Sequence, residues 1–208
     1  MNIGICGLDC STCSGHTSGE CRGCRKGGCS NDCAMRLCAE AKGVHVCKFC
    51  DEYESCDKIQ EFHERNPHGK ENLDAHYHKR KDGVMFASLH TGDEHTYSSV
   101  AAVGNMVYTS HTGGMVDDAG NRLDTLGEQT HQTLKNLRVQ LEEFGLDLDS
   151  VVKTTVYLRT MKDFRQMRDA YREYFTDGYP VRMTATTEFF DEGRLIMIDA
   201  VAYKRDDC

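Results

Sequence analysis

The chain has 208 residues and a formal net charge of -8 at pH 7, with 39% hydrophobic and 28% charged residues. These proportions exclude an extensively disordered chain, and the sequence holds no apolar run near the roughly 18 residues that a spanning helix needs. The acidic balance disfavours a sequence-independent grip on nucleic acid, which requires clustered lysine and arginine. The opening residues, MNIGICGLDC, lack the basic start of a secretory signal peptide. We therefore expect a cytoplasmic protein with neither a membrane nor a nucleic-acid partner.

Cysteine is distributed very unevenly along the chain. Eleven of the twelve cysteines lie in the first 56 residues, and the remaining one is Cys208, to which the sequence assigns no role. The charged, turn-forming stretch KRKDG ends at Gly83, and the apolar content rises after it. Because a chain of this length can hold two small domains, we expect a cysteine-rich domain over residues 1–82 and a second domain over residues 83–208.

The spacing of the cysteines indicates metal binding. Three CxxC pairs occur, and a two-residue spacer lets both thiolates of one turn point at the same ion. Cytoplasmic thiols are kept reduced, which favours metal ligation over disulfides. The candidate ligands are Cys6, Cys10, Cys13, Cys21, Cys24, Cys29, Cys33, Cys38, Cys47, Cys50 and Cys56. They predict zinc, with two or more ions in separate four-sulfur sites or in one shared cluster, and an iron–sulfur cluster is the alternative.

The role of the metal stays open between folding support and sensing. Few large apolar residues accompany the cysteines, so bound metal would supply folding free energy to this domain. A metal-sensing or redox-sensing role is the alternative. The segments CGLDCSTC, CRGCRKGG, CAMRLCAEAKGVHVC and KFCDEYESCDKI resemble a family of cysteine-rich domains of uncharacterised function. That resemblance implies metal binding and carries no reaction with it.

The second domain shows five strand-like segments and two amphipathic helices. The strand-like segments are SSVAAV, GNMVYTS, VVKTTVYL, RMTATTEF and LIMIDAVAY. One helical face carries Leu134, Leu137, Leu141 and Phe144, and the other carries Phe164, Met167, Tyr171 and Tyr174. The order strand, strand, helix, strand, helix, strand, strand predicts an α+β sheet with its helices on one face. The uncovered face predicts a homo-oligomer.

The ends of these two helices also carry signals. Gly145 follows the first helix and is expected to adopt a left-handed conformation that terminates it. Asp163 and Gln166 have the spacing of a capping box at the start of the second helix.

The same segments resemble a known family. GNMVYTSHTGG, YPVRMTATTEF and LIMIDAVAY, together with the helical stretch between them, are similar to the reactive intermediate deaminase (Rid) family from about Tyr97 to Tyr203. The resemblance implies a chorismate-mutase-like homotrimeric barrel with clefts between subunits that bind small carboxylated metabolites. Active members of the family hydrolyse imines or enamines to an oxo acid and ammonia.

The resemblance also implies site residues. The hallmark arginine corresponds to Arg182 of YPVRMTAT, and a guanidinium can bind a substrate carboxylate through two parallel hydrogen bonds. The other matching positions are Tyr97, Ser110, His111 in place of a glycine, and Thr184 in place of a cysteine. Met197 stands where active members have the glutamate that places water. His111 or Asp199 could compensate for that change.

Two functions are therefore expected. The first is a Rid-like deaminase of small imines or enamines that carry a carboxylate, anchored by Arg182 in a cleft between subunits. The alternative is a non-catalytic trimer that binds a metabolite and carries a metal-sensing or redox-sensing cysteine domain. Met197 favours the alternative, because a thioether positions or deprotonates water poorly.

Overall fold

The computed structural model describes residues 3–12, 14–20, 22–24, 33–88 and 96–205. The chain divides into two compact units, residues 1–97 and residues 98–208. Each unit is described separately below.

The second unit is built on five strands. They are β3 (Val100–Val103), β4 (Met106–Thr109), β5 (Val151–Leu158), β6 (Val181–Thr186) and β7 (Ile196–Tyr203). Their order across the sheet is β3, β4, β7, β5, β6. All neighbouring pairs are antiparallel except β5 and β6, which are parallel and place Thr154 opposite Arg182. The predicted element order and the α+β class are confirmed.

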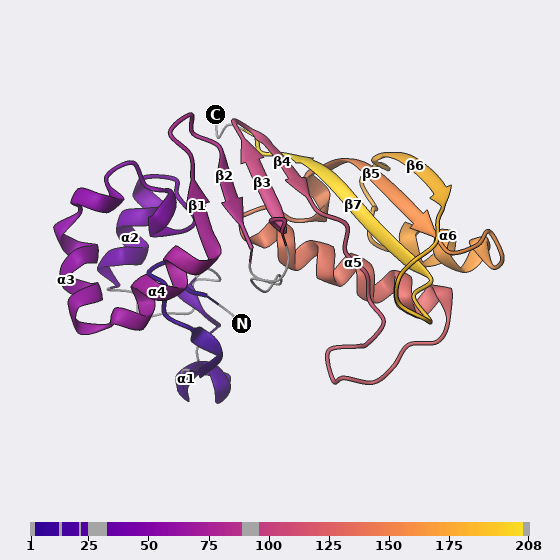
Figure 1. Cartoon of the computed structure of the whole chain (residues 1–208), viewed down its shortest axis with the longest axis horizontal. Coiled ribbons are helices and arrows are strands. Elements are labelled where there is room, and N and C mark those ends of the chain that lie inside the picture. The colour runs from indigo at the N-terminus through magenta and orange to yellow at the C-terminus, as the bar shows by residue number, and fades with distance from the viewer. Residues whose placement is uncertain (1–2, 13, 21, 25–32, 89–95, 206–208) are drawn as a thin grey trace. The chain divides into compact units, whose positions relative to one another are not determined.

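Two helices cover one face of this sheet. Figure 1 shows α5 (Leu126–Glu142) running along the strands, with α6 (Phe164–Arg172) beside β5 and β6. Ile196, Ile198 and Ala200 of β7 are buried, whereas the alternate residues Met197 and Asp199 are only half-buried. Because side chains alternate across a strand, the buried set faces the helices and the other set lies on the uncovered face.

The helices pack through the faces that the sequence predicts. Leu134, Leu137 and Leu141 of α5 are fully buried, as is Met167 of α6. Apolar residues three or four positions apart lie on one side of a helix, so these side chains pack against the sheet and exclude water from the space between helix and sheet.

The ends of the helices agree with the sequence in one place and differ in another. Gly145 has a positive φ of 70°, as expected for the residue that terminates α5. Asp163 makes no side-chain cap to α6 and has a left-handed φ of 63°, so the predicted capping box there is wrong. The capping box instead lies at the start of α5, where Thr125 accepts from the Glu128 amide and Glu128 accepts from the Thr125 amide. Spacing alone could not separate the two positions, because a cap also requires extended backbone at its first residue.

The first unit consists of short helices and one hairpin. Its helices are η1 (Cys10–Thr12), α1 (Ser14–Thr17), α2 (Ala34–Ala41), η3 (Cys47–Phe49), η4 (Tyr53–Ser55), α3 (Asp57–Arg65) and α4 (Pro67–His76). Strands β1 (Tyr77–Lys79) and β2 (Met85–Ala87) pair in antiparallel fashion. The KRKDG stretch is the turn of this hairpin, so the predicted limit between residues 82 and 83 falls inside the hairpin, and the two compact units divide after Tyr97.

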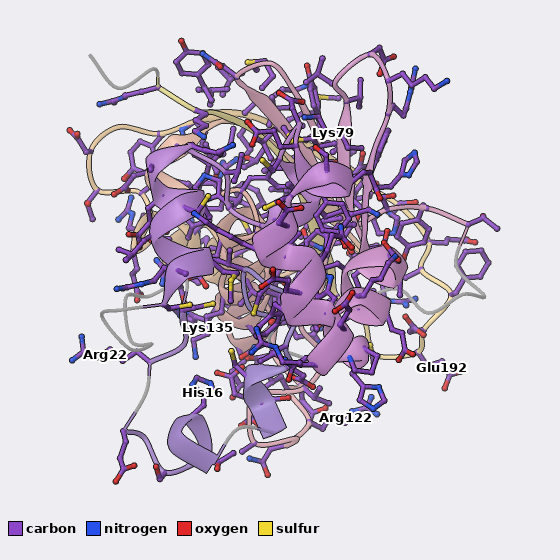
Figure 2. The ribbon with its side chains drawn as sticks, turned by 90° about the vertical axis from the view of Figure 1, so that its left-hand side faces the viewer. His16, Arg22, Lys79, Arg122, Lys135 and Glu192 are labelled. Atoms are coloured by element: carbon purple, nitrogen blue, oxygen red, sulfur yellow. The ribbon has the colours of Figure 1, made fainter. Side chains whose placement is uncertain are left out.

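A small core joins these elements. Val46, Phe49, Ile59, Leu73 and Tyr77 are buried, and the rings of Phe49 and Tyr77 meet edge to face at 5.5 Å. Lys79, labelled in Figure 2, donates from Nζ to the Phe49 carbonyl at 2.9 Å and thereby ties the hairpin to η3. Most helices of this unit have ten residues or fewer, and each therefore contributes few side chains to the core. A core of this size stabilises a small unit only weakly.

Gly7 lies against the backbone of α4. Its φ is +94°, and a Cβ built there would lie 1.9 Å from the carbonyl oxygen of Gly69 in α4. The Asn72 side chain donates to the Gly7 carbonyl at 2.9 Å. Only glycine fits this contact, because any side chain would collide with the backbone of α4.

We predict that Gly7→Ala loosens the first unit much more than Gly19→Ala does. Gly19 also has a left-handed φ, +79°, but nothing lies within 4 Å of its built Cβ. Gly19→Ala should therefore cost only the left-handed strain of about 1–2 kcal/mol, whereas Gly7→Ala adds the collision with Gly69. Hydrogen–deuterium exchange of peptides from residues 57–76 measures the difference. Equal exchange in the two variants would show that the Gly7 contact does not hold α4.

Candidate functional site

Arg182 lies on β6, the strand at one edge of the sheet. It pairs with Thr154 of β5, and Thr154 is completely buried under the helices. Residues that stand opposite each other in a ladder project from the same face, so the Arg182 side chain leaves the sheet on the side of α6. Thr184 follows on the same face two residues later and is half-buried.

An aromatic platform supports the Arg182 guanidinium. Its Cζ lies 5.0 Å from the ring centroid of Tyr171 and 5.9 Å from that of Phe164, both on α6. A guanidinium at this distance from an aromatic face is attracted by the ring quadrupole. Tyr171 is 2% exposed, and its hydroxyl hydrogen-bonds to Thr154 Oγ1 at 2.8 Å. The strand and the helix thus hold the arginine through one buried tyrosine.

The electrostatic surroundings of Tyr171 reflect this arrangement. Burial raises the pKa of Tyr171, while the hydrogen bond with Thr154 and the positive charge of Arg182 act in the opposite direction. The phenol therefore stays neutral at physiological pH, and its ring contacts the Arg182 guanidinium.

The guanidinium of Arg182 has no carboxylate partner among the described residues. Other arginines of the same unit do: Arg138 pairs with Asp147, Arg168 with Asp169 and Arg194 with Asp191. Arg182 is solvent-exposed, so its N–H donors remain available to a ligand. A guanidinium of this kind binds a carboxylate well, because two parallel N–H donors match two oxygens.

The other predicted residues lie elsewhere. Ser110 follows β4 directly and is half-buried, and its amide donates to the Ser99 carbonyl at 2.7 Å. His111 is exposed, and the next residue, Thr112, bridges to Ile198 of β7. Tyr97 is exposed and ends the first compact unit.

Within one chain, Arg182 and Ser110 lie far apart across the sheet. Strands β7 and β5 lie between β4 and β6. The ladders place Ser110 and Arg182 at nearly the same level, since Ala200 stands opposite Thr154 and its amide donates to Thr109 Oγ1. Three steps of about 4.8 Å lead from β4 to β6, so Ser110 and Arg182 are about 14 Å apart. In one chain, the residues predicted for the site therefore lie in two separate places.

The uncovered face carries a polar pair beside Met197. In the β5–β7 ladder, Tyr157 stands opposite Met197 and Thr155 stands opposite Asp199. Burial raises the pKa of Tyr157, and the charge of Asp199 acts in the same direction. Tyr157 and Asp199 therefore lie near each other on the face where Met197 lies.

Eight of the predicted metal ligands fall within the described residues, and they form two sets. In the first set, a Cβ built on Gly4 would lie 3.0 Å from Cys24 Sγ and 3.4 Å from Cys10 Sγ. A hydrogen bond between these two thiols, with burial, holds the pKa of Cys10 well above its ordinary value. Burial raises the pKa of Cys6 to about 11, and the charges of Cys24 and Cys33 add to this.

The second set surrounds a cavity of about 380 Å³ that is lined by Cys38, Cys47, Cys50 and Cys56. Burial raises the pKa of Cys47 to about 12, and the charges of Cys6 from the first set and of Cys56, Cys50 and Cys38 add to this. Cys6 therefore lies near both sets. Across the described ranges, no three His, Cys, Asp or Glu side chains are already arranged to hold a metal ion. Three predicted ligands, Cys13, Cys21 and Cys29, lie outside the described residues, as does Cys208.

Comparison with known proteins identifies the second unit. Residues 90–204 match the family described as endoribonuclease L-PSP, and the chain belongs to this family. Relatives of the chain include proteins named 2-iminobutanoate/2-iminopropanoate deaminase and Reactive Intermediate Deaminase A, so the Rid resemblance is confirmed for these residues. Residues 1–89 lie outside the match.

Particular relatives make the family more concrete. The human 2-iminobutanoate/2-iminopropanoate deaminase is 34% identical over 51% of this chain and 78% of its own length. A RutC family protein of Pyrococcus abyssi is 34% identical over 52% of this chain and 86% of its own length. A solved structure from Vibrio vulnificus has 26% identity and a TM-score of 0.51, and the match covers 56% of this chain and 98% of that one.

None of the helices that the structure describes has the length and apolar character of a membrane span.

Sequence reasoning missed the support beneath Arg182. Phe164 and Tyr171 were expected as members of an apolar helix face, and they are that, but they also form the platform of the arginine. Their spacing of seven residues placed both rings on one side of α6. Which strand lies against that side depends on the sheet order, which spacing does not contain.

We predict that Tyr171→Phe destabilises the second unit by about 1–3 kcal/mol, because it leaves the buried Thr154 hydroxyl without a partner. The double variant Tyr171→Phe with Thr154→Val should recover most of this loss, since both polar groups are then gone. Urea denaturation measures the free energy of unfolding, and exposed Tyr179→Phe is the matched control. Additive losses in the double variant would contradict the hydrogen bond as the cause.

Proposed function

We propose that the protein hydrolyses small imines or enamines that carry a carboxylate, releasing an oxo acid and ammonia. Water adds to the carbon of the C=N bond, and the resulting carbinolamine expels ammonia to leave a carbonyl group. The family membership of residues 90–204 and relatives named as 2-iminobutanoate/2-iminopropanoate deaminases support this class of substrate. The availability of the Arg182 guanidinium carries the proposal for this chain.

Arg182 would bind the substrate carboxylate and thereby place the imine carbon near β6. The aromatic platform of Tyr171 and Phe164 limits the motion of the guanidinium, so less entropy is lost when the ligand binds. Main-chain groups around Thr184 could orient the imine nitrogen, because such groups do not depend on the side chain at that position.

A second copy of the chain would complete the site. Ser110 and His111 are too far from Arg182 along one sheet to reach the same small substrate, so they would come from a neighbouring subunit, as Tyr97 would. A homotrimer is the assembly we propose. Val181 and Met183 on β6 are 73% and 59% exposed, and an exposed apolar edge of this kind is typical of a surface that another chain covers.

Asp199 of a neighbouring subunit would place the attacking water, because within one chain Asp199 lies on the uncovered face and Arg182 leaves the sheet on the side of α6. Met197 offers only a weakly accepting thioether, whereas Asp199 lies two residues away on the same face and is an ionisable carboxylate. His111 of the neighbouring subunit is the second group that could exchange a proton with the leaving ammonia.

Met197 also motivates a second candidate function. Without effective water placement, the same arginine would hold a carboxylated metabolite that is not turned over. The protein would then be a metabolite-binding trimer whose cysteine unit senses metal or redox state.

Zinc is the cofactor that we propose for the first unit, with an iron–sulfur cluster as the alternative. The donor set fits in kind, because thiols from separate segments gather in two places around a small core. Bound zinc would supply folding free energy to this unit.

We predict that the protein turns over 2-iminopropanoate and that Arg182→Ala lowers kcat/KM by about 30-fold to 1,000-fold, the effect of losing a charge-assisted bidentate contact of about 2–4 kcal/mol. An amino acid oxidase generates the imine in place, and semicarbazide competition follows its hydrolysis. Arg172→Ala, at the end of α6, is the matched control and should keep full activity. An inactive wild-type protein would favour the metabolite-binding function.

For Asp199→Asn, we predict a fall in kcat of about 100-fold with little change in KM, as expected for a group that acts on water and does not bind substrate. Asp177→Asn changes an exposed carboxylate of the same unit and should leave kcat unchanged. A normal kcat for Asp199→Asn, with a large loss for His111→Ala, would assign the water to the histidine.

A further inference from the structure

The four thiols of the cavity in the first unit come from two facing elements. Cys38 is on α2, whose residues Met35, Cys38 and Ala39 line the cavity together with Lys42, the C-cap of the helix. Their spacing of three, four and seven residues defines one helix face. The opposite wall is the segment from Val44 to Ile59.

That opposite wall has a period of three residues. The positions that line the cavity at this interval are Val44, Cys47, Cys50, Tyr53, Cys56 and Ile59. Backbone bonds of the 3₁₀ type produce the interval: the Cys50 amide donates to the Cys47 carbonyl at 3.0 Å, and the Tyr53 amide donates to the Cys50 carbonyl at 3.1 Å. The 3₁₀ helices η3 and η4 are short and alternate with extended residues at Cys50 and Cys56, and this backbone brings all three cysteines of the wall to the same cavity.

Neighbouring groups suit a cluster of thiolates. Lys42 and Lys58 line the same cavity, as do Glu52 and Asp57, and Lys42 is paired with Glu52 at 2.6 Å. Val44, Ala39 and Ile59 contribute apolar side chains to the wall. The four cysteines are half-buried, and a divalent ion with an affinity for sulfur would balance the charge of their thiolates.

We propose that Cys38, Cys47, Cys50 and Cys56 form a single tetrathiolate site for zinc, separate from the cysteines around Gly4. The sulfur atoms border a cavity of about 380 Å³ and do not yet meet at ligand distance. Binding would draw α2 and the 3₁₀ wall together, as metal binding coupled to folding does. This site is independent of the proposed deaminase function, because Arg182 and its platform belong to the second unit.

The two sets share a support but no thiol. The Ile5 amide donates to Cys24 Sγ at 3.1 Å, and the Ile5 carbonyl accepts from the Cys47 amide at 2.9 Å. Ile5, Cys24 and Ala39 form one small core cluster, and Cys47 packs against it. The tetrathiolate site uses neither Cys10 nor Cys24 as a ligand, so replacement of Cys10 should leave the four thiols able to bind zinc.

Alkylation of the full-length, reduced protein tests the site. Zinc is added to the metal-free protein, iodoacetamide is applied, and mass spectrometry measures the modification of each cysteine. We expect zinc to slow alkylation of Cys38, Cys47, Cys50 and Cys56 in parallel by at least about tenfold, because a bound thiolate is withdrawn from reaction. Alkylation of any one of the four at an unchanged rate would overturn the four-ligand site.

Variants test whether the site is separate. Cys50→Ser should lower the zinc content by one ion per chain and remove protection from Cys38, Cys47 and Cys56. Ser55→Ala, at a position that lines the same cavity without a thiol, should change neither. Cys10→Ser should leave protection of the four thiols intact. Loss of their protection in Cys10→Ser would instead establish one shared cluster, and unchanged zinc content in Cys50→Ser would exclude the site.

Discussion

The second unit depends on a sheet that is covered on one side only. Alternate residues of β7 and β5 are buried beneath α5 and α6, and the intervening residues remain on the uncovered face. Burial of the first set supplies the main stabilising free energy of the unit. The same arrangement leaves an apolar edge at β6 and a polar pair, Tyr157 and Asp199, on the uncovered face. The residues that we propose for binding and for water placement therefore lie where the folding of the unit leaves them uncovered.

Folding holds the Arg182 side chain in place and leaves its N–H donors without a carboxylate partner among the described residues. The buried Thr154 bonds to the buried Tyr171, and Tyr171 presents its ring to the guanidinium. The arginine is thus held by a ring face and keeps its N–H donors, whereas a carboxylate neighbour would have occupied them. Met197, where the Rid resemblance implies a glutamate, lies on the other face of the sheet. Binding and water placement are consequently separate questions in this protein.

The first unit has a small apolar core, so packing alone contributes little to its stability. Tight turns bring backbone into contact at Gly7 and Gly69, and the segment from Val44 to Ile59 brings three cysteines to one cavity. A row of thiols stabilises little by packing alone, since cysteine is a small side chain. Ligation of a metal ion would give the same row a large folding contribution. The zinc binding that we propose would explain why so short a segment carries so many cysteines.

The sequence by itself determined the elements of the second unit. Apolar periodicity defined α5 and α6, alternation defined the strands, and Gly145 marked a helix end, because each of these signals is local. The cysteine spacing likewise indicated metal chemistry. Only the tertiary structure decided which residues meet: the platform under Arg182, the strands that separate Ser110 from it, and the division of the thiols into two sets. These depend on sheet order and on contacts between distant segments, which no local pattern contains.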